Sequence, residues 1–462
     1  MDHSGAHPAD TIAAIATPLG EGGLAVIRIS GGGALAVADT CFVPAGGGSL
    51  PAAAAPTHTI HYGHVCLGGR RVDEVLVGVM RAPRTFTRED VVEITCHGGM
   101  LAAKLVLDAV LAGGARLAGP GEFTRRAFLN GRIDLAQAEA VADLIAARTD
   151  LALRAAGEQL AGKLSRRIEQ LRDQLLDTLA HVEAHIDFPD EDIAPDTREE
   201  LVLRLEGAVA FVAQLLRTAP EGRVLRSGVR AAIVGRPNAG KSSLLNHLLG
   251  RERAIVSPIP GTTRDTIEET ANVRGLPVIF IDTAGLREGG DDLEREGIRR
   301  SRESLEQAEL ILHVMDASEP LAPADEALLR EFAGRARLIV RNKTDLGFSL
   351  QLTPPPGVGV VDVSCATGAG LEALKDAIRS LIWSGEIRAE MLEVMINSRH
   401  ENALQRARTA ADRAAATLRA GATLELTALE LRIAVGAVGE IVGHTATEDL
   451  LDRIFSRFCI GK

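Results

Sequence analysis

Short apolar runs separated by turn residues fill the first quarter of the chain. The runs predict four strands, and one stretch with apolar residues at helical spacing predicts a helix. The strands are expected at 11–16, 24–29, 72–80 and 91–96, and the helix at 100–112. The Ala-, Gly- and Pro-rich segment 45–56 is expected to be a loop. Together these elements predict a compact α+β domain over residues 1–122.

From Ile133 onward the apolar period becomes helical. Apolar residues recur every three or four positions from Leu164 to Val182, which predicts a long helix with one packing face. This helix is expected to end near Pro189, since a proline disfavours helical backbone in the residue before it. Further helices are expected at 199–217, 389–420, 423–442 and 447–456. We interpret 123–225 and 384–462 as two parts of one helical domain, interrupted by an inserted domain over 226–383.

The inserted segment has the apolar runs of an α/β domain. Four strands are expected at 231–234, 277–281, 337–341 and 359–363, each followed directly by a polar motif. The predicted fold class is therefore multidomain, α/β and α. It combines an N-terminal α+β domain, a discontinuous helical domain and an inserted α/β domain.

The composition indicates a globular chain without a basic surface. Of its 462 residues, 46% are hydrophobic, and the formal net charge is −11, so any contact with nucleic acid needs a local patch or a partner. The cysteines contain no C-x-x-C pair, which argues against a disulfide framework or a zinc site. The sequence shows neither a signal peptide nor an apolar run long enough to cross a bilayer. We expect a cytoplasmic protein without stable membrane insertion.

The most specific motif is G-x-x-x-x-G-K-S at residues 235–242, which stands between an apolar strand and a leucine-rich helix. In this context the glycines let backbone N–H groups face phosphates, and the helix N-terminus adds the positive end of its dipole. Lys241 supplies a positive charge, and the hydroxyl of Ser242 can bind Mg²⁺. The alternative is an ordinary Gly-rich turn before a helix. The four matching positions favour a phosphate-binding loop.

Two further motifs fit a nucleoside triphosphate. The segment 260–265, P-G-T-T-R-D, offers hydroxyls that can complete Mg²⁺ coordination. The segment 282–285, D-T-A-G, offers a carboxylate that can hold the metal through water and a glycine N–H that can contact a γ-phosphate. Ras-type GTPases place a water-orienting glutamine directly after this motif, but here the residue is Leu286. The polar stretch 287–297 is a candidate source of the missing group, with solvated surface as the alternative for its carboxylates.

The segment Asn342-Lys343-Thr344-Asp345 resembles the guanine-specificity motif of GTPases. In that motif the Asp carboxylate accepts hydrogen bonds from N1–H and the exocyclic amine of guanine, a donor pair that adenine lacks. Ser364-Cys365-Ala366 resembles the loop that lies behind the base. GTP is therefore the expected nucleotide, and an ATPase is the alternative if Asp345 does not face the base.

Over almost its whole length the chain resembles the MnmE (TrmE) family of tRNA-modification GTPases. The resemblance rests on D-T-I-A-A at 10–14, P-G-E-F-T-R-R-A-F-L-N-G at 120–131, the GTPase motifs and F-C-I-G-K at 458–462. It implies an N-terminal folate-binding and dimerisation domain, a helical domain and an inserted Ras-like P-loop GTPase domain. It also implies a homodimer that acts with the flavoprotein MnmG (GidA). Together they add an aminomethyl or carboxymethylaminomethyl group to C5 of the wobble uridine (U34) of certain tRNAs.

The resemblance also implies roles for single residues of the GTPase domain. GTP is expected to contact Asn238, Ala239, Gly240, Lys241, Ser242, Ser243, Ser257, Pro258, Ile259, Pro260, Gly261, Thr262, Thr263, Asp282, Thr283, Ala284, Gly285, Asn342, Lys343, Asp345 and Ser364. Mg²⁺ is expected on Ser242 and Thr263, and K⁺ on Asn238, Ser257, Ile259 and Thr262. Glu294 corresponds to the family's water-orienting glutamate, and Arg264 and Asp265 are further catalytic candidates. Potassium-dependent dimerisation of the GTPase domains is expected to activate hydrolysis.

A tetrahydrofolate derivative, 5-formyl or 5,10-methylene, is the cofactor that the resemblance implies for the N-terminal domain. Its expected contacts are Arg28, Glu93, Arg132 and Lys462, with Arg132 standing where a lysine is frequent in the family. The alternative for Arg28 and Glu93 is a simple ion pair. Cys459 is expected either to assist the modification as a thiolate or to be a buried structural cysteine. A prenylation signal fits its neighbours poorly.

Two other functions stay open at this stage. A ribosome-assembly GTPase would be a binding switch without modification chemistry, and it predicts a basic RNA-binding module near the GTPase domain. A folate-binding sensor would use GTP hydrolysis only as a signal. The basic run of Arg399, His400, Arg406, Arg408 and Arg413 is expected to be a solvated helix face, with RNA contact as the alternative.

Overall fold

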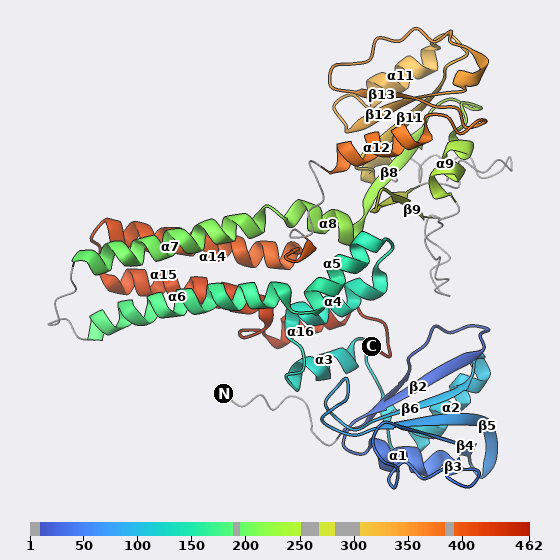
Figure 1. The fold of residues 1–462 in the computed structure, drawn as a ribbon, viewed down its shortest axis with the longest axis vertical. Helices are drawn as coiled ribbons and strands as arrows, with labels where there is room; N and C mark the ends of the chain where they lie inside the picture. The colour runs from blue at the N-terminus through green and yellow to red at the C-terminus, as the bar shows by residue number, and fades with distance from the viewer. Residues whose placement is uncertain (1–9, 188–194, 251–267, 282–304, 384–391) are drawn as a thin grey trace. The chain divides into compact units, whose positions relative to one another are not determined.

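The structure is a computed structural model that describes residues 10–187, 195–250, 268–281, 305–383 and 392–462 (Figure 1). The described residues form two compact units. Residues 10–142 and 442–462 belong to the first unit, and the described residues between 143 and 441 belong to the second. Among the described residues, no helix is both long and apolar enough to cross a membrane.

A seven-stranded sheet in the order β3-β4-β5-β6-β2-β1-β7 is the centre of the first unit. Its strands are β1 (Ile12–Ile15), β2 (Leu24–Ser30), β3 (Phe42–Pro44), β4 (Thr59–Leu67), β5 (Arg70–Met80), β6 (Val91–His97) and β7 (Arg116–Leu117). Helices α1 (Ala34–Cys41) and α2 (Met100–Ala112) cover one face, and their buried side chains form a single core with alternate residues of the strands. The four predicted strands and the predicted helix are confirmed.

Helix α1 and strands β3 and β4 were not predicted, because their apolar patterns are weak. In β4, histidines at positions 61 and 64 interrupt the apolar alternation, although His61 is buried and bonded to the hydroxyl of Thr59. A polar residue that finds a partner in the core weakens the pattern on which a strand prediction depends.

The C-terminal residues complete the first unit. Helix α16 (Glu448–Phe455) lies against α3 (Glu122–Leu129), where Arg125 bonds to Asp452 at 2.9 Å and pairs with Glu448. Beyond α16, Ile460 forms a β-bridge with Pro120. The chain end is thus folded into the unit that contains the N-terminal sheet.

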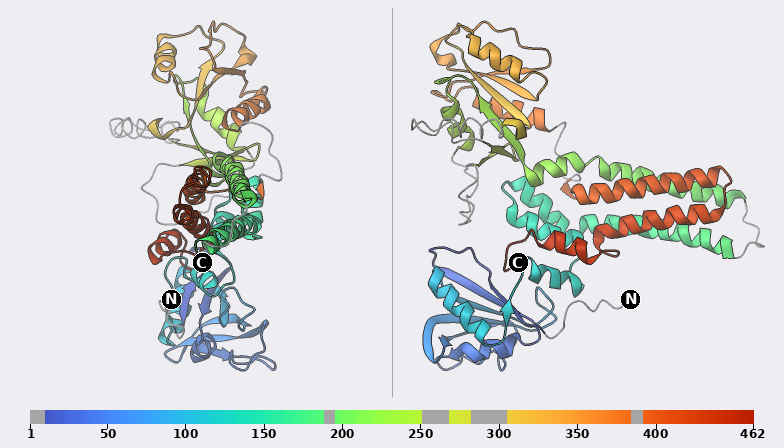
Figure 2. Two further views of the ribbon diagram at one scale, coloured as in Figure 1. Left: turned by 90° about the vertical axis from the view of Figure 1, so that its left-hand side faces the viewer. Right: turned by 180° about the vertical axis from the view of Figure 1, so that it is seen from behind.

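The second unit contains a helical bundle built from both flanks of the predicted insertion (Figures 1 and 2). Its helices are α5 (Asp150–Leu160), α6 (Lys163–Asp187), α7 (Pro195–Leu216), α8 (Ala219–Ser227), α14 (Ser398–Arg419) and α15 (Leu424–Val442). Most of α4 (Leu135–Ala146) belongs to the first unit. Helix α7 packs along α14, and Arg432 of α15 pairs with Glu183 of α6 at 2.7 Å. The prediction of a discontinuous helical domain is confirmed.

Helix α14 begins at Ser398, later than the expected start at 389. The reason is an N-cap at Asn397, whose side chain accepts a hydrogen bond from the backbone N–H of His400 at 2.9 Å. The expectation of a solvated basic face is wrong for two members of the run. His400 is fully buried, and Arg399 donates to the carbonyls of Glu440 and Ile441 at the end of α15.

The other part of the second unit is a six-stranded sheet in the order β13-β12-β11-β8-β10-β9. Its strands are β8 (Val229–Val234), β9 (Glu269–Val273), β10 (Leu276–Phe280), β11 (Leu310–Asp316), β12 (Arg337–Asn342) and β13 (Gly359–Asp362). All pairs are parallel except β9 with β10. The helices α9 (Lys241–Leu249), α11 (Pro323–Glu331) and α12 (Leu371–Ile382) accompany this sheet. The four predicted strands are confirmed, whereas β9 and the central strand β11 are additional.

Candidate functional site

The loop between β8 and α9 has the backbone that a phosphate-binding loop requires. Gly235 and Gly240 have φ values of 148° and 97°, and Asn238 adopts the left-handed conformation with φ 61°. A Cβ at Gly235 would lie 2.1 Å from the carbonyl oxygen of Val314 in β11. A Cβ at Gly240 would lie 2.1 Å from Nδ2 of Asn342. Both glycines are therefore required by close approach as well as by φ.

Lys241 is the first residue of α9, and its ammonium is held inside the loop. Its Nζ donates to the carbonyl oxygens of Gly235 at 2.9 Å and Arg236 at 2.7 Å. Burial lowers the pKa of Lys241, because the charged form is taken out of water. A half-buried cation whose hydrogen-bond acceptors in the described part of the chain are neutral carbonyls, at the N-terminus of a helix, is well placed to bind an anion. This is the observation that fits a nucleotide phosphate.

The end of β12 supplies a second group of side chains next to this loop. Asn342 donates from Nδ2 to the carbonyl of Ala239 at 2.9 Å and accepts from the backbone N–H of Cys365 at 3.1 Å. It thus ties the phosphate loop to the Ser364-Cys365-Ala366 loop. Ser364 donates its hydroxyl to Oδ1 of Asp345 at 2.5 Å. The structure thus brings together four residues that were predicted to bind nucleotide: Ala239, Asn342, Asp345 and Ser364.

Asp316 at the end of β11 belongs to this group, although the sequence analysis did not single it out. Its Oδ2 pairs with Nζ of Lys343 at 2.6 Å, and Lys343 has a left-handed backbone with φ 64°. Burial by itself raises the pKa of Asp316, but hydrogen bonds from Lys343 and Ser318 outweigh burial and hold it below its usual value. The apolar run 310–315 ending in an acidic residue was the signal that could have revealed it.

A large part of the predicted nucleotide site lies outside the described residues. The residues concerned are Ser257, Pro258, Ile259, Pro260, Gly261, Thr262, Thr263, Arg264, Asp265, Asp282, Thr283, Ala284, Gly285 and Glu294. Among the described residues, no group of three or more His, Cys, Asp or Glu side chains is placed to hold a metal ion. The assignments of Mg²⁺ and K⁺ therefore stay predictions.

A second group of predicted residues meets in the first unit. The register of β2 and β6 puts Arg28 opposite Glu93, and Nε of Arg28 donates to Oε1 of Glu93 at 2.8 Å. The predicted alternative of an ion pair is thus confirmed. The same guanidinium donates from Nη1 to the carbonyl of Gly461 at 3.2 Å and lies 5.7 Å from the ring centroid of Phe123.

Arg132 lies over a second ring of the same apolar cluster. Its guanidinium is 5.0 Å from the ring centroid of Phe86, and its Nη1 donates to the carbonyl of Thr85 at 2.6 Å. Phe86 packs against the cluster that contains Phe123. Two cations and one carboxylate therefore surround a small aromatic surface near the C-terminal tail.

Cys459 is exposed, so the interpretation as a buried structural cysteine is wrong. Its backbone is nevertheless held in place: the carbonyl accepts from the backbone N–H of Gly121 at 3.4 Å. At the end of the tail, the carbonyl of Lys462 accepts from the backbone N–H of Phe123 at 3.1 Å. The tail thus holds an exposed thiol on a hydrogen-bonded backbone, two residues before the Gly461 carbonyl that Arg28 contacts.

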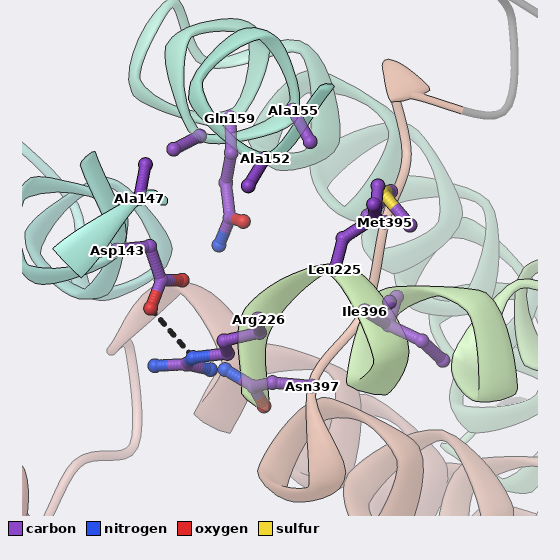
Figure 3. A pocket seen from close by; sticks show the side chains of 12 residues that line it. Asp143, Ala147, Ala152, Ala155, Gln159, Leu225, Arg226, Met395, Ile396 and Asn397 are labelled. Atoms are coloured by element: carbon purple, nitrogen blue, oxygen red, sulfur yellow. Dashed lines mark ion pairs between the residues drawn. The ribbon is translucent and has the colours of Figure 1, made fainter. Parts of the chain in front are cut away.

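The helical part of the second unit contains a separate cavity (Figure 3). It is lined by Asp143, Ala147, Ala152, Ala155, Ala156, Gln159, Gly222, Leu225, Arg226, Met395, Ile396 and Asn397. Nε of Arg226 lies 2.5 Å from Oδ1 of Asp143, so the two charges in its wall neutralise each other. None of the residues predicted to bind a ligand lines this cavity.

Comparison with known proteins decides the family. The MnmE helical domain matches residues 135–459, and the N-terminus of the GTP-binding protein TrmE matches residues 11–132. The chain belongs to the MnmE family. The tRNA modification GTPase MnmE of Geobacillus kaustophilus is 49% identical over 460 residues, which cover 98% of this chain and 99% of that protein. The tRNA modification GTPase MnmE of Chloroflexus aurantiacus is 50% identical over 459 residues, which cover 98% of this chain and 100% of that protein.

Among solved structures, Era of Aquifex aeolicus bound to GDP and aluminium fluoride is 31% identical, with a TM-score of 0.26. The match covers 39% of this chain and 66% of Era. Membership of the MnmE family agrees with the multidomain fold described above, which combines an N-terminal α+β domain, a divided helical domain and an inserted P-loop domain.

Proposed function

We propose that this chain hydrolyses GTP and acts in tRNA modification, as an enzyme that helps to place an aminomethyl or carboxymethylaminomethyl group on C5 of the wobble uridine U34. The one-carbon unit comes from 5-formyl- or 5,10-methylene-tetrahydrofolate. One observation carries the proposal: the C-terminal tail, which carries the exposed Cys459, is bonded to the Arg28–Glu93 pair through the carbonyl of Gly461. The identity of 49% and 50%, over 98% of this chain, to proteins named tRNA modification GTPase MnmE supports the proposal.

In the nucleotide site, Lys241 turns from the carbonyl of Gly235 to the β- and γ-phosphates while it keeps its bond to the carbonyl of Arg236. Asp345 accepts from the guanine base while Ser364 holds its carboxylate in place. Mg²⁺ would be held by Ser242 and Thr263. A Mg²⁺ ion neutralises charge that develops on the phosphates.

The potassium site would combine Asn238 with Ser257, Ile259 and Thr262. Asn238 fits such a role because its left-handed backbone places it at the turn of the phosphate loop. Potassium would supply positive charge there, a role that an arginine finger has in Ras-type enzymes. We propose that potassium-dependent contact between two GTPase domains completes the site with Glu294.

The folate site follows from the charges in the first unit. Arg28, Arg132 and Lys462 attract the carboxylates of a folate, while the partly exposed carboxylate of Glu93 accepts from the N–H groups of a pterin. The aromatic surface of Phe86 and Phe123 provides apolar area beside these groups. These residue types therefore fit a flat heterocycle with an acidic tail.

The proposed homodimer has support in the sheet of the first unit. The face of the sheet that α1 and α2 leave uncovered carries Ile60, Tyr62 and Leu76, which are 73%, 42% and 46% exposed. Tyr62 and Leu76 are direct neighbours across β4 and β5. An apolar patch of this kind is typical of an interface. We assign it to the second copy of the chain, and MnmG and tRNA to other surfaces.

Deletion of the gene tests the proposal. We expect tRNA from the deletion strain to lack the C5 group on U34 entirely, and plasmid-borne wild-type protein to restore it, as measured by mass spectrometry of tRNA nucleosides. The ribosome-assembly alternative predicts intact U34 modification together with incomplete ribosomal subunits. The folate-sensor alternative predicts intact modification with normal ribosomes. Unchanged modification in the deletion strain would refute the proposed function.

Glu294→Ala tests the proposed source of the water-orienting group. We expect the GTP hydrolysis rate in potassium buffer to fall about 100-fold, because Leu286 cannot orient the attacking water. Affinity for GDP should stay within about twofold, since Glu294 is assigned to the transition state and not to binding. Glu296→Ala in the same stretch is the matched control and should hydrolyse GTP at the wild-type rate. If Glu294→Ala and Glu296→Ala behave alike, the assignment is wrong.

A further inference from the structure

Arg236 occupies a central place in the phosphate loop although no ligand role is assigned to it. Its carbonyl oxygen accepts from Nζ of Lys241 at 2.7 Å and from the backbone N–H of Ala239 at 3.3 Å. The orientation of this one peptide therefore fixes both the loop and the cation that binds phosphate. Any group that fixes the Arg236 side chain also restrains this peptide.

Two carboxylates outside the loop hold the Arg236 guanidinium. Asp325, in the first turn of α11, pairs through Oδ2 with Nε of Arg236 at 2.8 Å. Glu319 accepts from Nη2 at 3.0 Å. The two carboxylates differ in environment, because the Asp325 side chain is 1% exposed and that of Glu319 is 56% exposed. A buried ion pair is broken at a high cost, whereas an exposed one contributes little.

The surroundings of Asp325 leave Arg236 as its main charged partner. His313 of β11 is fully buried, and burial lowers its pKa to about 4, although the nearby Asp325 opposes this shift. His313 is therefore neutral near pH 7 and cannot neutralise the carboxylate. Arg337 of β12 donates from Nη1 to the carbonyl of Leu329.

Several buried polar atoms of this group have no hydrogen-bond partner among the described residues: both ring nitrogens of His313, Nε of Arg337, Oδ1 of Asp325 and Nε of Arg236. The 2.8 Å contact between Nε of Arg236 and Oδ2 of Asp325 is thus an ion pair without hydrogen-bond geometry. The residues around Asp325 therefore form few hydrogen bonds that could compensate for the loss of the ion pair.

We propose that the ion pair between Arg236 and the buried carboxylate of Asp325 positions the phosphate loop, so that α11 sets the nucleotide affinity of the site. Asp325 acts through Arg236, whose peptide in turn places Lys241; it touches no nucleotide itself. Removing the carboxylate frees the guanidinium and lets the Arg236 peptide rotate away from Lys241 and Ala239. The inference rests on the proposed binding of GTP at this loop.

Asp325→Asn in the full chain tests the inference. Asparagine has nearly the same volume and can still accept from the backbone N–H of Ala322, as Asp325 does at 3.3 Å, but it has no charge for Arg236. We expect the Kd for N-methylanthraniloyl-GDP, measured by fluorescence titration, to rise at least tenfold. Glu319→Gln removes the exposed partner of the same guanidinium and should change the Kd by less than twofold.

A second control separates positioning from a general loss of stability. Leu374 of α12 is fully buried in the core of the same sheet, so Leu374→Ala should lower the thermal midpoint at least as much as Asp325→Asn. Its Kd for the labelled GDP should nevertheless stay within twofold at a temperature where the protein is folded. A Kd for Asp325→Asn within twofold of wild type, or an equal loss of affinity in Leu374→Ala, would overturn the inference.

The ion pair can also be tested from its other side. Arg236→Ala and Asp325→Ala should each weaken binding, and the double variant should be no weaker than the worse single variant, because the two residues act as one unit. Arg236→Lys keeps the charge and should recover part of the affinity lost in Arg236→Ala. Additive losses would contradict the coupling. Absence of GDP binding in the wild-type protein would refute the proposed function itself, whereas wild-type affinity in these variants refutes only the role of the pair.

Discussion

Asp345→Asn is expected to lower the affinity for GTP by at least 100-fold and to raise the affinity for xanthosine triphosphate. Guanine presents two donors, N1–H and the exocyclic amine, and a carboxylate offers acceptors for both. The amide of asparagine replaces one acceptor with a donor, which leaves a base N–H unpaired and adds a repulsive contact. A loss of about 3 kcal/mol is reasonable for bonds to a charged group, and this corresponds to more than 100-fold. Xanthine has a carbonyl in place of the exocyclic amine, and the amide N–H of asparagine can donate to that carbonyl.

Competition between labelled GDP and unlabelled nucleotides measures this change in nucleotide preference directly. Ser364→Ala is the matched control, because it removes only the hydroxyl that bonds Oδ1 of Asp345 at 2.5 Å. We expect it to weaken GTP binding by less than tenfold without any gain for xanthosine triphosphate. If Asp345→Asn keeps its preference for GTP, the base is not bound by Asp345, and the adenine nucleotide alternative should be tested next.

Cys459→Ser is expected to abolish U34 modification and to leave GTP hydrolysis at the wild-type rate. The thiol is exposed, and the backbone of the tail is fixed by the bond from Gly121 and by the bridge between Pro120 and Ile460. Serine preserves these backbone contacts and nearly the same side-chain volume. It cannot supply a thiolate, the nucleophilic form of cysteine. The loss should therefore be confined to the chemistry at the Arg28–Glu93 pair.

Two measurements on each variant decide this prediction: tRNA nucleosides by mass spectrometry in a complemented deletion strain, and GTP turnover with purified protein. Cys66→Ser is the control. Cys66 is a partly exposed thiol of the same unit, but it lies on β4 and is not part of the tail. It should keep both activities. Full modification in Cys459→Ser would show that the tail has only a structural role.

The sequence predicted most elements whose pattern is local. The helix expected at 100–112 and the strand expected at 91–96 are present because their apolar periods are regular and end at clear turn signals. The central strand β11 was missed, although every one of its residues is buried. His313 in its middle and Asp316 at its end make the run look less like a strand. His313 is buried as a neutral ring, and Asp316 is paired with Lys343, which follows β12.

The residues of the candidate site also fall into two groups, those that a local motif predicts and those that only tertiary contacts reveal. Lys241, Asn342, Asp345 and Ser364 were predicted because each belongs to a motif whose chemistry is contained in a few neighbouring residues. Asp316 and Asp325 were not predicted, since their partners, Lys343 and Arg236, come from other motifs. An isolated acidic residue in a sequence is most simply interpreted as solvated surface, and only burial shows otherwise.

The sequence by itself determined the phosphate loop, the expected nucleotide and the family, because these depend on residue types at fixed short spacings. Only the tertiary structure decided that Arg28 and Glu93 form an ion pair, that Cys459 is exposed and that the tail reaches this pair. Arg28 and Gly461 are 433 residues apart, and no local pattern encodes their contact. The contact arises because α16 and the tail pack with α3 and β-bridge to Pro120, burying apolar surface that neither segment can bury alone.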